Sequence, residues 1–309
     1  MRWAAIDIGT NTTLMLVAER GPDGELRAVE DRMEITRLGR GVDRTKRLDD
    51  AAVAETLAAL ERHVARARAL GVVKIAAVAT SAARDATNGG EFRARAAEIL
   101  GAELAIASGD REASLTFAGA LGGLGLMRGA RVAVIDVGGG STEVVVGVVG
   151  DDVLSFSHSY DVGSVRLTER CVKHDPPSDD ELAAIEHAVA EQLTGTPPPR
   201  SPLDALVAIA GTATTYAAID LRLSDYAAAP PHGHRLSQAS LRAHVEALAA
   251  TPLASRRGTI GLEPGRADVI VAGGVVLATM AAALSGADLV ISDRGVRWGL
   301  ALEMAGAGR

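Results

Sequence analysis

The order of apolar and amphipathic stretches along the chain predicts a mainly parallel α/β protein. Short, continuous apolar runs bounded by glycine or polar residues are typical of buried strands. Such runs fall within residues 3–8, 14–18, 26–38, 72–78, 104–107, 132–135, 144–149, 205–210 and 289–291. Apolar residues at helical spacing predict helices at residues 49–70, 92–100, 108–121, 181–193 and 267–284, with another after residue 297. Strands that alternate with helices of this length favour parallel sheets with covered faces.

One pattern occurs twice: an apolar run, Asp-x-Gly, a cluster of small polar residues and a second apolar run. The first copy contains Asp7, Gly9, Thr10, Asn11 and Thr12, and the second contains Asp136, Gly138, Gly139, Gly140, Ser141, Thr142 and Glu143. The three consecutive glycines of the second copy free the backbone to adopt positive φ and let backbone amides approach a ligand closely. Successive amides in such a turn can bind an anion. A plain hairpin turn would explain either copy alone, whereas the repetition predicts two similar halves that each present a phosphate loop.

Other polar positions leave two interpretations open. Arg84 follows the apolar run 72–78 and either points toward a ligand or lies on the surface of a first helical turn. Glu112 opens a helix, where an acid ordinarily complements the helix dipole. Gly211 and Thr212 form a third turn of small residues after a strand.

Two histidines are expected to be surface residues. His232 and His234 lie in a loop that is rich in proline and glycine. The sequence around them gives no sign of a ligand.

Composition excludes several classes of function. The chain has 309 residues, a net charge of −7 and only 3% aromatic residues, so we expect no binding to nucleic acid or to anionic membranes. Cys171 is the single cysteine, which excludes an internal disulfide and a cysteine-rich metal site. Val269–Leu284 is short for a membrane span and predicts a buried helix. Because no signal segment opens the chain, we expect a cytoplasmic protein.

The length of the chain and a glycine-rich stretch near its middle predict two domains. The glycine-rich stretch at residues 122–125 is the best linker, which gives domains at residues 1–122 and 126–309. The sequence has no Gly-Lys dipeptide, no His-Glu-x-x-His and no Gly-x-Ser-x-Gly. These absences argue against a common P-loop, a zincin and a serine hydrolase.

With these motifs in place, the chain resembles the exopolyphosphatase / guanosine pentaphosphate phosphohydrolase (Ppx/GppA) family. The resemblance rests on residues 7–12, 80–86, 108–113, 136–143, 163–167, 211–214 and 294–297, in the family's order. It implies an α/β fold with two ribonuclease H-like domains, as in the actin, Hsp70 and sugar-kinase superfamily, around a central cleft. It also implies the short form, without the C-terminal HD-like domain of longer members.

The resemblance implies that Glu112 is the catalytic carboxylate. The family commonly has Ser-Gly-x-Glu-Glu-Ala, whereas this chain has Arg111 in place of the first glutamate. We expect Arg111 to remove like-charge repulsion and to keep Glu112 ionised. The two glycine loops, Gly211 and Thr212 would bind phosphates.

The resemblance also implies a cation and further phosphate contacts. Mg²⁺ or another divalent cation would be held through Asp136, Glu143 or Asp7. Arg84, and less directly Arg166, Arg266 and Arg294, would contact phosphates further along the substrate.

The implied reaction is attack of water on a terminal phosphoryl group. The substrate would be inorganic polyphosphate; guanosine pentaphosphate (pppGpp) and a non-catalytic sensor of polyphosphate or nucleotide remain alternatives. A kinase or ATPase of the same superfamily has no positive feature here. A homodimer is expected.

Overall fold

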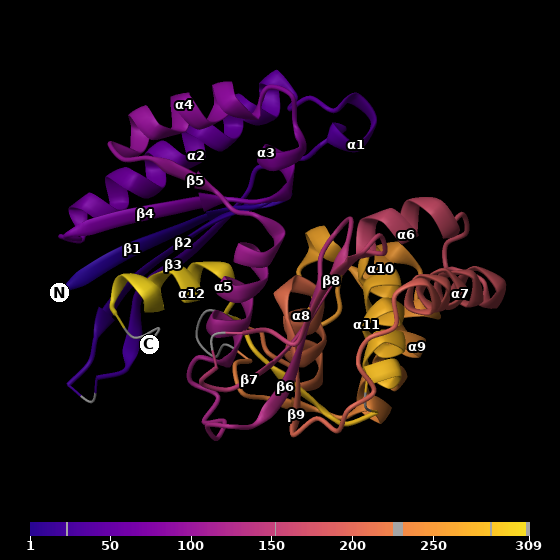
Figure 1. Ribbon diagram of the computed structural model, residues 1–309. Helices are drawn as coiled ribbons and strands as arrows, with labels where there is room; N and C mark the ends of the chain where they lie inside the picture. The colour runs from indigo at the N-terminus through magenta and orange to yellow at the C-terminus, as the bar shows by residue number, and fades with distance from the viewer. Residues whose placement is uncertain (23, 152, 225–230, 285, 307–309) are drawn as a thin grey trace. The chain divides into compact units, whose positions relative to one another are not determined.

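The computed structural model describes residues 1–22, 24–151, 153–224, 231–284 and 286–306 (Figure 1). The chain divides into two compact units. Unit 1 comprises Met1–Gly119 and Val296–Arg309, and unit 2 comprises Ala120–Gly295.

Unit 1 is built on a five-stranded sheet in the order β3-β2-β1-β4-β5. An antiparallel meander of β1 (Arg2–Ile8), β2 (Thr12–Arg20) and β3 (Leu26–Ile35) is extended by β4 (Lys74–Ala79) and β5 (Leu104–Ile106), with β4 parallel to both β1 and β5. The short helices α1 (Val42–Thr45) and α3 (Ser81–Asp85) follow strands β3 and β4.

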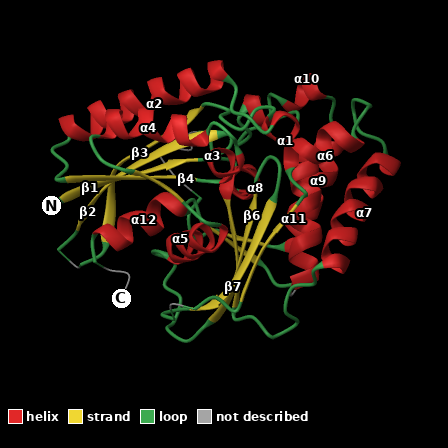
Figure 2. Ribbon diagram, turned by 45° about the horizontal axis from the view of Figure 1, so that its top comes forward, coloured by secondary structure: helices red, strands yellow, loops and turns green. Residues whose placement is uncertain are grey.

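Helices cover both faces of this sheet. Successive residues of β1 point to opposite faces, and the apolar residues on each face pack against helices. Ile6 and Ile8 pack in one core with residues of α2 (Asp50–Ala69) and α4 (Gly89–Leu100). Trp3 packs in a second core with Trp298 of α12 (Val296–Met304). Figure 2 shows α2 and α4 along one face and α12 along the other. Helix α5 (Gly109–Leu121) contributes Leu115 to a third, small cluster.

The C-terminal helix differs from the expected division of the chain. The sequence analysis assigned residues 126–309 to the second domain, whereas α12 belongs to unit 1. The physical reason is apolar burial: Trp298 is 4% exposed and Ala301 is fully buried against β1 and β2.

Unit 2 repeats the order of unit 1 in a six-stranded sheet, β10-β11-β9-β6-β7-β8. The antiparallel strands β6 (Arg131–Val137), β7 (Thr142–Val148) and β8 (Phe156–Tyr160) correspond to β1–β3. The parallel strands β9 (Ala205–Ile209) and β11 (Leu289–Ile291) correspond to β4 and β5, and β10 (Arg235–Leu236) is added at the edge.

The helices of unit 2 pack around one apolar helix, α11 (Ile270–Leu284). Most residues of α11 are buried and belong to the core of this unit. The others are α6 (Ser164–Cys171), α7 (Asp179–Gly195), α8 (Ala210–Asp220), α9 (Gln238–Ala249), α10 (Leu253–Arg256) and the 3-10 turn η1 (Pro264–Arg266). Helix α11 contacts α6, α7, α8 and α9. The prediction of a buried helix here is confirmed, and none of the described helices is both long enough and apolar enough to cross a membrane.

The repeated strand order confirms the predicted duplication of an α/β, ribonuclease H-like unit. The expectation that both glycine loops line one central cleft stays a prediction.

Candidate active site

The first glycine loop (loop 1, residues 9–12) joins β1 to β2 and is held closed by its own backbone. The Gly9 amide donates to the Thr12 carbonyl at 2.9 Å. The segment after β3 packs on the same loop, since the Gly39 amide donates to the Thr10 carbonyl at 2.8 Å and the Arg37 amide donates to the Asn11 carbonyl at 2.9 Å. The loop is therefore fixed at its base and along one side.

The second glycine loop (loop 2, residues 138–142) joins β6 to β7 in the same way. The Gly138 amide donates to the Ser141 carbonyl at 3.0 Å. The start of α6 packs on the loop: the Ser164 amide donates to the Gly138 carbonyl at 2.9 Å, and Arg166 Nε donates to the Gly140 carbonyl at 2.6 Å. The Arg166 guanidinium is thus used to hold the loop.

The glycines of the two loops do not use the positive φ that glycine permits, and some of them lie close to neighbouring backbone. Neither Gly9 nor any glycine of loop 2 lies in the left-handed region. A Cβ on Gly138 would lie 3.1 Å from the Ser141 carbonyl oxygen, and one on Gly9 would lie 3.2 Å from the Thr12 oxygen. A Cβ on Gly163 would lie only 2.5 Å from the Gly139 oxygen. A Cβ on Gly163 would therefore force the backbone to shift, whereas one on Gly9 or Gly138 would require the neighbouring carbonyl to move by a few tenths of an ångström.

Asp7 is a buried carboxyl group at the end of β1. It is 9% exposed, and its Oδ1 has no hydrogen-bond partner within the described part of the chain. Burial raises the pKa of Asp7 to about 7; the negative charge of Glu112 acts in the same direction, and Arg297 opposes it. Asp7 and Glu112 therefore influence each other through their charges, and the catalytic role of Glu112 stays a prediction.

Arg84 and Glu112 contact each other. Arg84 Nη1 donates to Glu112 Oε2 at 3.2 Å and to the Ala107 carbonyl at 3.0 Å. Arg84 therefore bridges the end of β5 and the first turn of α5. Arg84 is exposed and lies in the short helix α3, as a surface arginine would, but it also contacts Glu112; its role toward phosphate stays a prediction.

Arg111 has a different partner from the one expected. Both of its terminal nitrogens pair with the carboxylate of Glu303 on α12. This contact raises the pKa of Arg111 and ties α5 to α12. The charge of Arg111 is thus engaged by Glu303, and Arg84 is the cation that pairs with Glu112.

Asp136 and Glu143 are directly opposite each other on β6 and β7, so their side chains leave the same face of the sheet. Glu143 Oε1 accepts hydrogen bonds from Ser141 Oγ at 2.7 Å and from Ser159 Oγ at 2.6 Å. Two opposed carboxylates repel each other, and a cation would relieve that repulsion.

The donor set fits Mg²⁺. This ion is usually held by one or two carboxylates together with phosphate oxygens and water. Within the described ranges there is no cluster of three or more His, Cys, Asp or Glu suited to a metal ion. A pair of carboxylates completed by substrate phosphates is compatible with that finding.

The third turn lies close to an arginine. A Cβ on Gly211 would lie 2.0 Å from Arg266 Nη1, and Thr212 Oγ1 donates to the Val137 carbonyl at 3.5 Å. Gly211, Thr212 and Arg266 therefore belong to the surroundings of loop 2. Arg294 lies against Gly123, whose added Cβ would be 2.7 Å from Arg294 Nη1.

Three polar residues of the site were missed by the sequence analysis. Ser81 Oγ and Thr10 Oγ1 are 2.9 Å apart, which links loop 1 to α3. Ser159 orients Glu143 from β8, and Arg297 acts on Asp7. Ser81 and Arg297 lie inside the family motifs, whereas Ser159 could be found only by knowing the register of β7 and β8.

The histidines in the loop before β10 are partly buried, contrary to expectation. His232 Nδ1 lies 3.0 Å from Asp293 Oδ1, and His234 Nε2 lies 2.8 Å from Asp220 Oδ2. Asp220 also contacts His244 Nε2 at 2.9 Å. These pairs tie the loop to the ends of α8 and β11.

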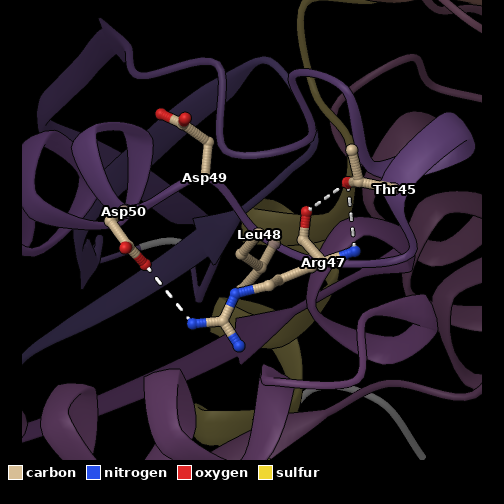
Figure 3. A pocket seen from close by; sticks show the side chains of 5 residues that line it. All are labelled: Thr45, Arg47, Leu48, Asp49 and Asp50. Carbon is tan, nitrogen blue, oxygen red and sulfur yellow. Dashed lines mark hydrogen bonds and ion pairs between the residues drawn. The ribbon is translucent and has the colours of Figure 1, made fainter.

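A surface hollow in unit 1 is separate from these groups. It has a volume of about 240 Å³ and is lined by Thr45, Arg47, Leu48, Asp49 and Asp50 (Figure 3). Arg47 Nη2 and Asp50 Oδ1 lie 3.7 Å apart across it. None of the predicted site residues lines it.

Comparisons with known proteins identify the family of this chain. A model of the Ppx/GppA phosphatase family matches residues 16–307. Exopolyphosphatase 2 of Mycobacterium tuberculosis is 39% identical over 321 residues, which covers 99% of each chain. A guanosine-5'-triphosphate,3'-diphosphate pyrophosphatase of Vibrio cholerae is 36% identical over 148 residues, which covers 47% of this chain and 29% of the relative. The crystal structure of an Aquifex aeolicus Ppx/GppA phosphatase superposes with a TM-score of 0.81 at 29% identity and covers 98% of this chain and 99% of that one.

Proposed function

The chain belongs to the Ppx/GppA phosphatase family, and we propose that it is an exopolyphosphatase that releases terminal orthophosphate from inorganic polyphosphate. The observation that carries the proposal is the contact between Arg84 of α3 and Glu112, together with the contact between Ser81 of the same helix and Thr10 of loop 1. It sets a carboxylate and a guanidinium beside a loop of phosphate-binding type. The full-length similarity to an exopolyphosphatase supports the choice of substrate.

In the proposed reaction, the oxygen of water attacks the terminal phosphorus and the bond from that phosphorus to the bridging oxygen breaks. The shortened chain leaves with the bridging oxygen. Transition states of this kind are loose, so positioning and charge neutralisation matter more than a strong base. Glu112 orients the water and accepts its proton, while Arg84 fixes the carboxylate and faces the phosphate.

The two loops bind phosphate groups through backbone amides and hydroxyls. Loop 1 supplies Thr10, Asn11 and Thr12, and loop 2 supplies Ser141 and Thr142, although the Thr142 hydroxyl is engaged with the Val162 carbonyl at 2.6 Å. We therefore expect the loop 2 amides and Ser141 to contribute more than Thr142. Gly211 and Thr212 extend the surroundings of loop 2.

Asp136 and Glu143 are the proposed ligands of a divalent cation. When bound, Mg²⁺ would offset the negative charge of the phosphates. Ser141 and Ser159 orient the Glu143 carboxylate by hydrogen bonds, which is the role of groups that surround metal ligands.

The test is phosphate release from long-chain polyphosphate, pppGpp and ATP, measured side by side with Mg²⁺. We expect the highest kcat/KM with polyphosphate. A clear preference for pppGpp would replace the proposal with a guanosine pentaphosphate phosphohydrolase. Tight binding of polyphosphate without release of phosphate would indicate a sensor.

We also propose that the enzyme acts as a homodimer in the cytoplasm, without nucleic acid or membrane partners. The net charge of −7 and the 3% aromatic content support the absence of polyanionic nucleic acid partners. Sedimentation of the purified chain and fractionation of cells check these points.

A further inference from the structure

A strongly basic segment follows β3 in an otherwise acidic protein. Between residues 37 and 47 the chain has five basic residues and one acid, although its net charge is −7. The basic residues are Arg37, Arg40, Arg44, Lys46 and Arg47. We call residues 37–47 the basic segment.

The basic segment is anchored at both ends. At its start, the amides of Arg37 and Gly39 donate to loop 1 carbonyls at 2.9 and 2.8 Å. At its end, the Lys46 carbonyl accepts the Thr87 amide at 2.8 Å, just before α4. Leu38 is fully buried and Val42 is 5% exposed, so apolar contacts hold the middle. Its charges therefore lie on a fixed path that begins at loop 1.

Three of the five charges lack an acidic partner. Arg40 pairs with Asp49 at 2.8 Å, and Arg47 approaches Asp50 at 3.7 Å. The side chains of Arg37, Arg44 and Lys46 are exposed, and no ion pair is found for them in the described part of the chain. Uncompensated cations held next to a phosphate loop attract further phosphates.

The backbone adds a second observation. Arg37 has φ of 50° and Lys46 has φ of 53°, and these are two of the four non-glycine residues with positive φ in the described ranges. A side chain in this conformation is uncommon, and glycine usually occupies it. Glycine would relieve the conformation at both positions but would remove a positive charge from each.

We propose that Arg37, Arg44 and Lys46 bind internal phosphates of a polyphosphate chain whose terminal group lies at loop 1. This inference rests on the proposed function. Arginine offers a planar fork and lysine a mobile point charge, and both suit a repeating, flexible polyanion. The surface hollow beside α2 is not part of the proposed path of the polyphosphate chain, because the acidic residues Asp49 and Asp50 line it and would repel phosphate (Figure 3).

The consequence is a preference for long chains. A substrate with two or three phosphates at loop 1 meets only the start of the basic segment at Arg37, whereas a long chain extends along it to Arg44 and Lys46. The segment therefore lowers KM for long chains and leaves the chemical step unchanged.

The test variant is Arg37→Asn/Arg44→Gln/Lys46→Asn. Asparagine tolerates positive φ, so the backbone is retained. The matched control is Arg95→Gln/Arg242→Gln/Arg257→Gln, which removes three exposed arginine charges from helices or helix ends elsewhere. Both triple variants change the net charge by the same amount.

We expect the test variant to raise KM for long-chain polyphosphate roughly 10-fold at unchanged kcat, with a much smaller rise in KM for tripolyphosphate. The slope of log KM against log salt should fall by about 2, since each contact contributes about 0.7 on a flexible polyanion. Equal effects of the test and control variants, or no effect of either, would overturn the inference. Calorimetric binding of long-chain polyphosphate decides the same question if wild type releases no phosphate, a result that would count against the proposed function alone.

Discussion

Loops 1 and 2 have nearly the same backbone but different carboxyl groups. In each, the first glycine amide donates to a carbonyl three residues on, at 2.9 Å for Gly9 and 3.0 Å for Gly138. In each, a glycine from a following segment lies against the loop: Gly39 at loop 1 and Gly163 at loop 2. The duplicated unit has therefore kept the geometry that suits phosphate binding.

The carboxyl groups before the two loops have different surroundings. Asp7 is buried, stands opposite Leu14 across the hairpin and interacts with Glu112. Asp136 is half-buried and stands opposite Glu143, which two hydroxyls orient. The two hairpins thus differ at the position opposite the aspartate. Leu14 stands there in the first hairpin, and Glu143 stands there in the second, which therefore offers two carboxylates to a cation. On this difference rests our proposal that unit 1 activates the water and unit 2 holds the cation.

The largest expected effect is at Glu112. Glu112→Gln removes the group that accepts the proton, so turnover should fall roughly 10²–10⁴-fold. Folding and polyphosphate binding should remain. Turnover is measured by phosphate release and binding by calorimetry.

Asp110→Asn is the control for that change, since Asp110 lies two residues earlier and points to another side of α5. An inactive Asp110→Asn beside a nearly active Glu112→Gln would show that the catalytic carboxylate is Asp110. If Glu112 only complemented the helix dipole, its replacement would cost about 0.3–1 kcal/mol of stability and little turnover.

Asp7 should make stability depend on pH. Its folded pKa of about 7 lies above the ordinary 3.8, so the folded state binds more protons between these values. The free energy of unfolding should therefore fall as pH rises through this window, by about 4 kcal/mol in all, since each pKa unit is worth ~1.4 kcal/mol. Urea unfolding at pH 5 and pH 8 without metal should show about 3 kcal/mol of this loss, since about two pKa units of the window lie above pH 5.

Asp7→Asn provides the comparison, because an amide does not titrate. The difference in unfolding free energy between wild type and Asp7→Asn should change with pH in the stated direction. The same pH dependence in both proteins would contradict the assigned pKa.

The glycines beside the loops should have smaller effects. Gly163→Ala brings a Cβ to 2.5 Å from a backbone oxygen, which must shift. We expect a loss of about 1–3 kcal/mol in unfolding free energy, as is typical of overpacking. Gly90→Ala is the matched control, since a Cβ there meets nothing within 4 Å. Equal stability of the two variants would argue against close approach as the reason for Gly163.

Replacing Ser159 should weaken the binding of the cation and leave the rest of the site unchanged. Ser159→Ala removes one hydrogen bond to Glu143, and loss of such a supporting contact weakens metal affinity about 10–100-fold. The Mg²⁺ concentration for half-maximal activity should rise, while activity at saturating Mg²⁺ should return to the wild-type value. A lower rate at saturation would place Ser159 in substrate binding. Ser157→Ala, on the same strand, is the control.

The strands and the duplication could be predicted because their signals are local. Val132, Val134 and Ile135 form an uninterrupted apolar run and are fully buried in β6. Strand β8 was missed because Ser157, His158 and Ser159 interrupt any apolar pattern.

The rest depends on contacts between distant residues. Nothing near Trp298 in the sequence indicates that α12 packs on β1 and β2, and nothing near Arg111 indicates Glu303 as its partner. The two glycine loops lie where the sequence pattern predicts turns between strands. The pattern does not tell whether a glycine is needed for a positive φ angle or for a close contact with neighbouring backbone. The contact between Arg84 and Glu112 joins residues 28 positions apart, and nothing in the sequence pairs them.

The most direct test of the division between the two loops is Mn²⁺ binding, followed by electron paramagnetic resonance, in Glu112→Gln and Asp136→Asn. With a polyphosphate analogue present, Glu112→Gln should bind Mn²⁺ as tightly as wild type, whereas Asp136→Asn should bind it at least about 10-fold more weakly. Equal loss of affinity in both variants, or wild-type affinity in Asp136→Asn, would contradict the assignment of the cation to loop 2.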